Sequence, residues 1–482
     1  MKCLNFLKSI IIICCCVLSV SISGFKKAKS GNRPNIILVL ADYQGWGDVG
    51  YNGHPVVKTP NLDDMAGSGL RFDRFYSAAP VCSPTRASIM TGRHPNRFGC
   101  FTWGHTLRPQ EYTIAEALKD AGYVTDHFGK WHLGPVYKDS PVNPGASGFD
   151  EWFSSPNYFD NDPILSRKGI AVQTQGESSM VTVDAALEFI RENRSRPFFA
   201  YICFGSPHGK HIAIEQYKEL YPDQIEKLQN FFGEITGIDM AVGKLRRELK
   251  NIGIEKNTVL WYLSDNGGLK WGIQGGREMK GSIYEGGLRV PSIVEWPGQI
   301  KNPGITNIPC NTSDIYPTFI DIAEINSENK HVLDGISLEP LFKNEMKSRE
   351  NPIGFWKYPK RGNKVASYQL MLELLQKQQA GDMKVDSSKL ELYAGEITKQ
   401  YPADILPGHA AWLDWPYKLH RIRSGNNKIK YELYNIEVDP YEKNNIAGRV
   451  QNQVESMSCQ LEEWMRSVIN SLNGDDYLNT EK

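Results

Sequence analysis

The run "NIILVLA" (Asn35–Ala41) is short, apolar and rich in branched side chains, which is typical of a β-strand. Three further runs share this character: "YVTDHF" (Tyr123–Phe128), "PFFAYICF" (Pro197–Phe204) and "TVLWYLS" (Thr258–Ser264). Segments with helical periodicity, such as "TIAEALKDAG" and "VTVDAALEFIREN", lie between them. This alternation predicts an α/β sandwich: a large, mostly parallel sheet with helices on its faces.

Polar side chains follow each predicted strand. They are Asp42 after the first, Lys130 and His132 after the second, His208 after the third, and Asp265 with Asn266 after the fourth. Ligands of open α/β sheets bind beyond the carboxyl ends of the strands. We therefore expect these side chains to converge at one edge of the sheet.

The stretch "VCSPTRASIMTGR" (Val81–Arg93) places Cys82 two residues before a proline and four before an arginine, at the start of a helix-like segment. Taken alone, the pattern fits a packed thiol, a thiolate nucleophile or a site read by a modifying enzyme. The other cysteines expected in the mature chain, at 100, 203, 310 and 459, form neither a disulfide framework nor a zinc motif.

Length and charge limit the classes of protein to consider. The chain has 482 residues, with 55 basic and 55 acidic side chains, so no global field attracts nucleic acid or an anionic membrane. We predict a catalytic α/β domain over residues 24–350 and a smaller antiparallel-sheet domain over 351–482 that completes the substrate cleft. The "SGNN" turn at 424–427, between alternating segments, predicts a hairpin in the second domain.

The N-terminus has the layout of a secretory signal peptide. Lys2 and Lys8 precede the apolar run "IIIICCCVLSV" and the small residues that end at Ser23. We predict that residues 1–23 are removed and that the chain is exported, to the periplasm or beyond, without stable membrane insertion. An uncleaved membrane anchor is the alternative.

The residue types at the strand ends suit a particular chemistry. Asp42, Asp265 and Asn266 offer hard oxygen ligands, which favour calcium or magnesium over zinc. Each residue alone fits an ordinary turn or helix cap, and the lysines and histidines alone fit surface positions. Together they predict a site for a multiply negative tetrahedral group.

The sequence resembles the type I sulfatases of the alkaline phosphatase superfamily. The resemblance runs through "RPNIILVLADYQGWGDVGYNG", "SAAPVCSPTRASIMTGRHPNR", "GYVTDHFGKWHLG", "SPH", "SDNGG", "GSIYEGGLRVPSIVEWPG" and "YELYNIEVDPYEKNNIA". Its most specific element is Cys82-x-Pro84-x-Arg86, the signature read by the formylglycine-forming maturation enzyme. In that family the cysteine becomes formylglycine (3-oxoalanine), whose hydrate is the nucleophile.

The resemblance implies a role for each candidate residue. The expected calcium ligands are Cys82 (as formylglycine), Asp42, Asp265 and Asn266. The other expected catalytic residues are Arg86 and Lys130 on the diol oxygens, His132 as the base for sulfate elimination, Lys280 on the sulfate and His208 as the acid for the leaving alcohol. These expectations describe a calcium-dependent sulfatase.

One position departs from the family pattern. Two adjacent aspartates usually follow the first strand, whereas this chain has Asp42-Tyr43 and then Gln44. The Gln44 amide, the Tyr43 hydroxyl or water could replace the missing carboxylate. The departure keeps one alternative open, a catalytically silent binder of sulfated glycans. A phosphodiesterase or phosphonate hydrolase on the same scaffold would use similar residues and is a further alternative.

The substrate prediction is a sulfated polysaccharide or oligosaccharide. Aromatic segments such as "FTWGH" and "DEWFSSPNYFDND" could hold sugar rings, although ordinary packing explains them equally well. Arg97, His105 and Arg421 are candidate contacts to further sulfate or carboxylate groups. Two longer segments resemble sulfatases that act on algal galactans such as carrageenan.

Overall fold

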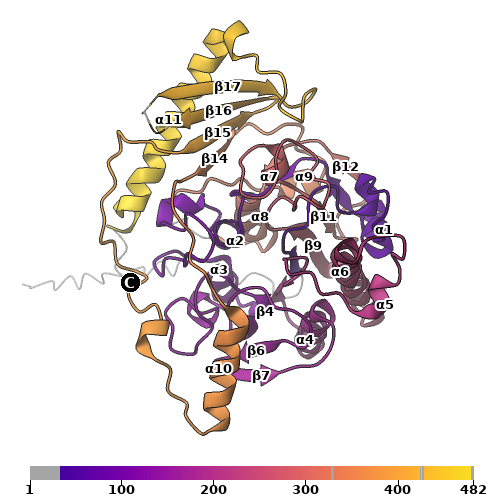
Figure 1. Ribbon diagram of the computed structural model, residues 1–482. Helices are drawn as coiled ribbons and strands as arrows, with labels where there is room; N and C mark the ends of the chain where they lie inside the picture. Colours follow the sequence, from indigo (N-terminus) through magenta and orange to yellow (C-terminus); the bar gives the residue numbers. More distant parts are fainter. Residues whose placement is uncertain (1–32, 327–330, 424, 426–427, 479–482) are drawn as a thin grey trace, which may run out of the picture. The chain divides into compact units, whose positions relative to one another are not determined.

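A ten-stranded sheet forms the centre of the computed structural model, which describes residues 33–326, 331–423, 425 and 428–478 (Figure 1). Its strands, in spatial order, are β12 (Gly304–Thr306), β2 (Leu70–Phe72), β11 (Ser292–Glu295), β9 (Thr258–Ser264), β1 (Asn35–Ala41), β8 (Phe198–Cys203), β4 (Val124–Lys130), β5 (Glu151–Ser155), β6 (Ile164–Arg167) and β7 (Ile170–Gln173). The central strands from β9 to β5 are parallel. The predicted mostly parallel sheet is confirmed.

The register of the central strands brings their carboxyl ends level. Ala41 of β1 pairs with Ser264 of β9, and Leu40 pairs with Cys203 of β8. Cys203 also pairs with Gly129 of β4. The residues that follow these four strands therefore start from one edge of the sheet, as predicted.

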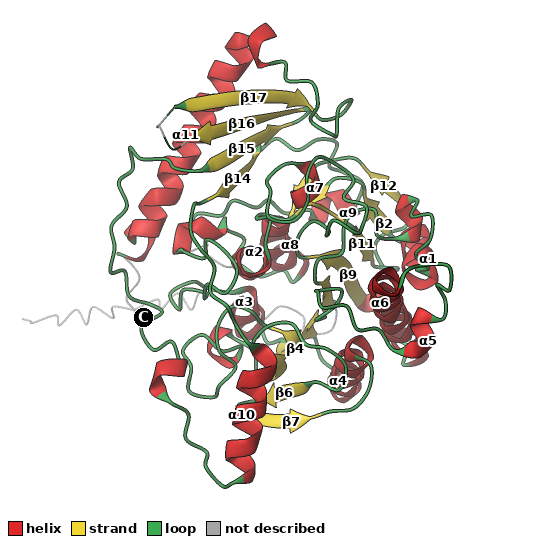
Figure 2. Ribbon diagram, viewed as in Figure 1, coloured by secondary structure: helices red, strands yellow, loops and turns green. Residues whose placement is uncertain are grey.

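Helices cover both faces of the sheet (Figure 2). The even-numbered side chains of β1, Ile36 to Leu40, share a buried cluster with α2 (Cys82–Thr91), α3 (Ile114–Asp120) and α8 (Ile315–Ile322). The odd-numbered ones, Ile37 to Ala41, pack with α1 (Pro60–Ser68), α4 (Ser178–Asn193) and α6 (Glu226–Asn251). A strand buried on both faces explains why "NIILVLA" is apolar throughout instead of alternating. The remaining helices are α5 (Glu215–Lys218), α7 (Glu285–Leu288), α9 (Glu339–Phe342), α10 (Ser367–Gln379) and α11 (Gln451–Asn473).

Helix α2 carries the cysteine signature and has well-defined ends. Val81 precedes it in extended conformation, and Cys82 is its first residue. It ends at Gly92, whose φ of 71° is left-handed and whose missing Cβ would lie 3.0 Å from Tyr316. Glycine therefore both permits the turn and allows α8 to approach.

A second sheet is antiparallel, in the order β14 (Ile353–Lys357), β15 (His409–Asp414), β16 (Tyr417–Arg423) and β17 (Ile429–Asn435). It packs against α11 around Trp356, Leu419 and Leu461 (Figure 1). The pairing of Arg423 with Ile429 confirms the predicted hairpin, although most of its "SGNN" turn lies outside the described residues. A small third sheet joins β10 (Arg289–Val290), β3 (Phe75–Tyr76) and β13 (Cys310–Asn311).

Arg33–Lys482 form one compact unit, and the predicted boundary at residue 350 stays a prediction. The predicted signal peptide, residues 1–23, lies outside the described residues. Within the described part of the chain, no helix combines the length and apolar character needed to span a bilayer.

A buried ionic cluster joins the second sheet to α7. Lys418 of β16 lies 2.8 Å from Glu285 and 3.4 Å from Glu442, and all three side chains have no exposed surface. Glu442 also contacts His420 Nε2 at 2.7 Å and accepts a hydrogen bond from the backbone N–H of Glu285. Lys418 is thus the cation between two buried carboxylates.

Replacing Lys418 should destabilise the protein strongly. Lys418→Met leaves Glu285 and Glu442 buried without their cation, and we expect the free energy of unfolding to fall by about 3–5 kcal/mol. The matched control is Lys430→Met in β17. The Lys430 side chain is 69% exposed, and its pair with Glu432 should contribute less than about 1 kcal/mol. Denaturant unfolding of both variants measures the difference, and equal losses would contradict the assignment.

Candidate active site

The level strand ends bring together two buried ion pairs. Lys130 Nζ, at the end of β4, lies 2.6 Å from Asp42 Oδ2 after β1. Arg86 of α2 donates to Asp265 Oδ2 after β9, with Nη2 at 2.9 Å. Arg86 Nη1 also donates to the carbonyl oxygen of Lys130 at 2.8 Å, which links the two pairs. These four side chains are 0–1% exposed, so their charges interact in a poorly solvated environment.

Cys82 lies beside both carboxylates. Its sulfur and one oxygen each of Asp42 and Asp265 lie within 4.8 Å of one another. Burial and the neighbouring Asp42 carboxylate raise the pKa of Asp265 to about 6. Burial also raises the pKa of the Cys82 thiol. The unmodified thiol is therefore a poor source of thiolate, and the two carboxylates favour a cation between them.

The oxygens left without partners fit a hard metal ion. Among the described residues, Asp42 Oδ1 and Asn266 Oδ1 are buried and accept no hydrogen bond. An unpaired buried oxygen costs free energy, which coordination to a cation removes. Carboxylate and amide oxygens are the ligands of calcium and magnesium. Asp42, Asp265 and Asn266 could thus hold such an ion next to residue 82.

Tyr43 occupies the position where the family pattern has a second aspartate. Its φ of 77° is unusual for a residue with a side chain, and its N–H donates to Asp265 Oδ1 at 3.2 Å. The Tyr43 hydroxyl oxygen lies 3.1 Å from Cys82 Sγ. The Gln44 amide, by contrast, accepts from the Tyr262 hydroxyl and donates to the Asp48 carbonyl. Of the three predicted replacements for the carboxylate, these contacts favour the Tyr43 hydroxyl or water over Gln44.

The remaining predicted catalytic residues line one cavity of about 1030 Å³. His132 has a φ of 56°, and neither of its ring nitrogens has a partner among the described residues. Burial and the charges of Lys130 and Arg86 lower the pKa of His132 well below its usual value. His132 is therefore neutral at pH 7 and available as a base.

His208 and Lys280 lie against the ring of Tyr43. The His208 ring is held between Tyr43, at 4.3 Å between ring centroids, and Tyr158, at 3.8 Å. Its Nδ1 lies 2.7 Å from the Gly209 carbonyl oxygen, which leaves Nε2 as the nitrogen that exchanges protons with a ligand. Lys280 Nζ lies 3.1 Å from the Tyr43 ring centroid. Four of the six predicted catalytic residues thus lie against Tyr43: Cys82, Lys130, His208 and Lys280.

Two predicted substrate residues lie elsewhere, in buried ion pairs. Arg97 binds Asp334 with Nε at 2.7 Å and Nη2 at 2.8 Å, and Arg421 binds Glu462 with Nε at 2.9 Å. Both arginines are 2–3% exposed, and neither lines the cavity. Their role in this structure is to join distant segments of the chain.

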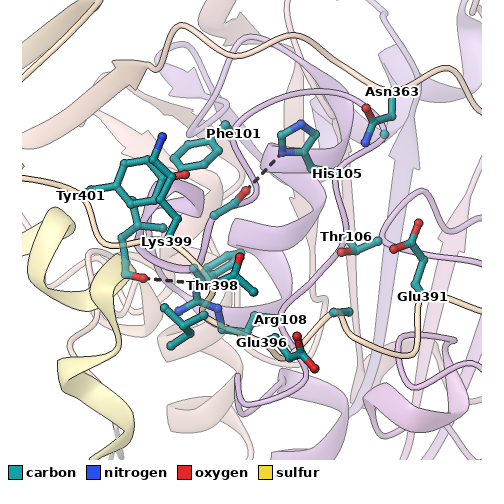
Figure 3. A pocket seen from close by; sticks show the side chains of 16 residues that line it. Phe101, His105, Thr106, Arg108, Asn363, Glu391, Glu396, Thr398, Lys399 and Tyr401 are labelled. Atoms are coloured by element: carbon teal, nitrogen blue, oxygen red, sulfur yellow. Dashed lines mark hydrogen bonds between the residues drawn. The ribbon is translucent and has the colours of Figure 1, made fainter.

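His105 lines a separate pocket of about 270 Å³ (Figure 3). Its Nδ1 faces the Gly99 carbonyl, and Arg108, Glu396 and Lys399 also line the pocket. The pocket lining includes none of the six predicted catalytic residues. His105 also lines a smaller pocket, of about 170 Å³, whose lining includes His132, so its predicted contact with the substrate stays a prediction.

Several residues of the active-site cavity were not singled out from the sequence. They are Trp103, Asn157, Tyr158, Lys210, Lys364 and Tyr368. The aromatic residues among them fall in or near segments noted for their aromatic content, and this content was the only sign in the sequence that they line a cavity. Lys364 and Tyr368 come from beyond residue 350, so the C-terminal part of the chain helps to line this cavity.

Known proteins resemble the chain over most of its length. The sequence pattern of the Sulfatase family matches residues 34–325. Mouse N-acetylgalactosamine-6-sulfatase is 34% identical over 396 residues, 72% of each chain, and the ulvan-active sulfatase of Formosa agariphila is 30% identical over 343 residues, 65% of each. The crystal structure of Ps i-CgsB in complex with k-i-k-neocarrahexaose has a TM-score of 0.75 at 24% identity and covers 93% of this chain and 100% of its own. This chain belongs to the sulfatase family.

Proposed function

We propose that this chain is an exported, calcium-dependent sulfatase that removes sulfate esters from a sulfated polysaccharide or oligosaccharide, with formylglycine at position 82. The observation that carries the proposal is the position of Cys82. It begins α2 within Cys-x-Pro-x-Arg and lies beside two buried carboxylates and unpaired oxygens that fit a hard cation. The signal-like N-terminus supports export.

The cavity supports a carbohydrate substrate. Trp103, Tyr158 and Tyr368 offer aromatic surfaces, and Asn157, Asn161 and Gln369 offer amides, which together suit the faces and hydroxyls of sugars. The relatives named above are called N-acetylgalactosamine-6-sulfatase and ulvan-active sulfatase, and both names describe action on sulfated sugars or polysaccharides. We extend that substrate class to this chain.

Two components would supply chemistry that the unmodified side chains lack. When bound by Asp42, Asp265 and Asn266, calcium would offset negative charge and favour an ionised hydroxyl at residue 82. Formylglycine hydrate supplies two hydroxyls, one to attack sulfur and one whose ionisation lets sulfate be expelled. A plain alcohol or thiol lacks this second route.

The chain's own cations position the sulfate. Lys130 and Arg86 form ion pairs with the Asp42 and Asp265 carboxylates next to residue 82. Lys280 lies over the Tyr43 ring and lines the cavity. These fixed charges stabilise negative charge on the sulfate oxygens without reorganisation during the reaction. Lys280, which is the most accessible of the three, is placed to contact the sulfate itself.

The two histidines transfer protons at different stages. Burial and the charges of Lys130 and Lys280 lower the pKa of His208, and a bound sulfate offsets those charges. His208 can then donate from Nε2 to the leaving alkoxide, which contributes on the order of 10²–10⁴-fold in rate. Neutral His132 removes the proton from the second hydroxyl on residue 82, and this releases sulfate.

The second candidate function is a silent binder of sulfated glycans. Tyr43 favours the binder, because it stands in place of an expected carboxylate and because the Tyr43 hydroxyl contacts Cys82 directly. Position 82 separates the two functions, since a binder needs no formylglycine.

The mass of the peptide that contains residue 82 tests the proposal. Conversion of the thiol to the aldehyde lowers its mass by about 18 Da. We expect this loss in protein from the native host, together with release of free sulfate from galactan or glycosaminoglycan oligosaccharides. An unmodified cysteine without sulfate release would favour the binder.

Tyr43→Asp should bind calcium more tightly, because it restores a carboxylate next to Asp42. We expect the calcium Kd, measured by calorimetry, to fall about tenfold or more. Wild-type activity should fall on mild chelation and recover with added calcium. Tyr43→Phe is the control: a rise in its Kd identifies the hydroxyl as a ligand, and an unchanged Kd identifies water. Calcium binding by Tyr43→Asp no tighter than wild type would show that position 43 does not face the ion.

Cys82→Ser should complete one half of the reaction and then stop. The serine hydroxyl can attack sulfur with Arg86, Lys130 and His208 in place, but it has no second hydroxyl for His132 to deprotonate. Rapid mixing should show at most one equivalent of desulfated product per enzyme, with sulfate retained on residue 82 by peptide mass. Sustained turnover would show that the diol is unnecessary and would favour the phosphohydrolase alternative.

A further inference from the structure

Two cavities meet at the reaction centre. The first is the cavity of about 1030 Å³ that contains His132 and Lys280. The second, of about 580 Å³, is lined on its far side by Glu226, Lys227, Leu269 and Trp271. Tyr43, His208 and Lys210 line both cavities, so the proton donor of the proposed reaction stands at their junction.

The walls of the second cavity are cationic. Lys227 Nζ lies 3.5 Å from the centroid of the Trp271 ring, and Lys270 Nζ lies 4.1 Å from it. Within the described part of the chain, no carboxylate lies within salt-bridge distance of Lys210, Lys227 or Lys270. Two of these lysines, Lys210 and Lys227, line the cavity beside the single carboxylate of Glu226, and Lys270 adds a third ammonium group against the Trp271 ring. The positive charge is therefore available to a ligand.

The same segments that carry the catalytic residues build this second cavity. Lys210 follows His208 after β8, and Trp271 follows Asp265 and Asn266 after β9. His211 Nδ1 lies 2.8 Å from Glu234 of α6, which attaches the β8 loop to the helix that carries Lys227. The distance between the cationic wall and the reacting sulfate is thus set by strand ends and by α6.

The two cavities differ in character. The first is larger and carries most of the aromatic rings and amides that suit a sugar, whereas the second is smaller and has two lysines beside one carboxylate. Its volume falls within the range of about 300–1000 Å³ that is usual for small-ligand sites. A ligand that fills both cavities passes Tyr43 and His208 and carries negative charge on the side of Lys227.

We propose that the second cavity is a subsite for an anionic group, a sulfate or a carboxylate, on a sugar next to the one that loses its sulfate. This inference rests on the proposed function and extends it. The scissile ester then belongs to a sugar within a polyanionic chain that extends on both sides of His208, instead of to an isolated or terminal sugar. Lys227 and Trp271 act as specificity residues for the neighbouring unit.

Binding to a non-hydrolysing protein tests this subsite without depending on turnover. The background is full-length Cys82→Ala, and the probes are three galactan hexasaccharides of equal length. One carries a single sulfate, one carries a second sulfate on the adjacent sugar, and one carries a carboxylate there instead. Calorimetry gives the Kd of each probe, and a comparison of the last two identifies which anion the subsite takes.

The variants are Lys227→Gln and Trp271→Ala, and the control is Lys250→Gln at the other end of α6. Lys250 is exposed, lies in the last turn of the same helix and undergoes the same change of charge. Loss of a charged contact should raise the Kd of a two-anion probe about tenfold in Lys227→Gln. The single-sulfate probe should change less than about twofold, and Lys250→Gln should match the background with every probe.

Three results would overturn the inference. They are equal Kd values for Lys227→Gln and Lys250→Gln, an equal loss for the single-sulfate and two-anion probes, or no preference of the background protein for a second anion. Failure of the proposed sulfatase activity is observed separately, as an absence of sulfate release by the protein that retains Cys82. Binding data with Cys82→Ala are unaffected by that outcome.

Discussion

The burial of two carboxylates with two cations, Asp42 with Lys130 and Asp265 with Arg86, is the constraint on which the rest of the site depends. Charges that lose their hydration are tolerated only with well-placed partners, so the strands must end level and α2 must start beside them. This arrangement leaves unpaired oxygens on Asp42 and Asn266, which point to a further cation. The arrangement that stabilises the buried charges thereby also prepares the site for an anionic substrate.

Tyr43 changes the balance of charge in this arrangement. An aspartate at position 43 would add a negative charge, whereas the buried tyrosine adds a ring that contacts Lys280 on one side and His208 on another. Attraction between the ammonium and the ring partly replaces the charge that is missing. The same ring stands between the two cavities, so it also shapes the passage for the substrate.

The sequence was most informative about features that depend on neighbouring residues along the chain. The runs at Asn35–Ala41 and Thr258–Ser264 are strands with the predicted bounds, because strands buried on both faces are marked by continuous apolar sequence. Arg97 was predicted to contact the substrate because nothing near it in the sequence pairs with its charge. Its actual partner, Asp334, lies 237 residues away. Lys364 was missed for the same reason, since a loop lysine carries no local sign of the cavity it reaches. Long-range pairing decides such cases, and a single sequence does not record it.

The position of Lys280 depends on both sheets. Its loop is held to the second sheet before and after the lysine: Arg277 donates to the Tyr434 hydroxyl and the Glu442 carbonyl, and Lys357 donates to the Gly281 carbonyl. At its far end, Glu285 is bound by buried Lys418. A loop without these contacts would have to lose conformational entropy whenever it bound a ligand. The second sheet therefore helps to hold Lys280 over Tyr43, and the conformational entropy of this loop is lost during folding instead of on binding.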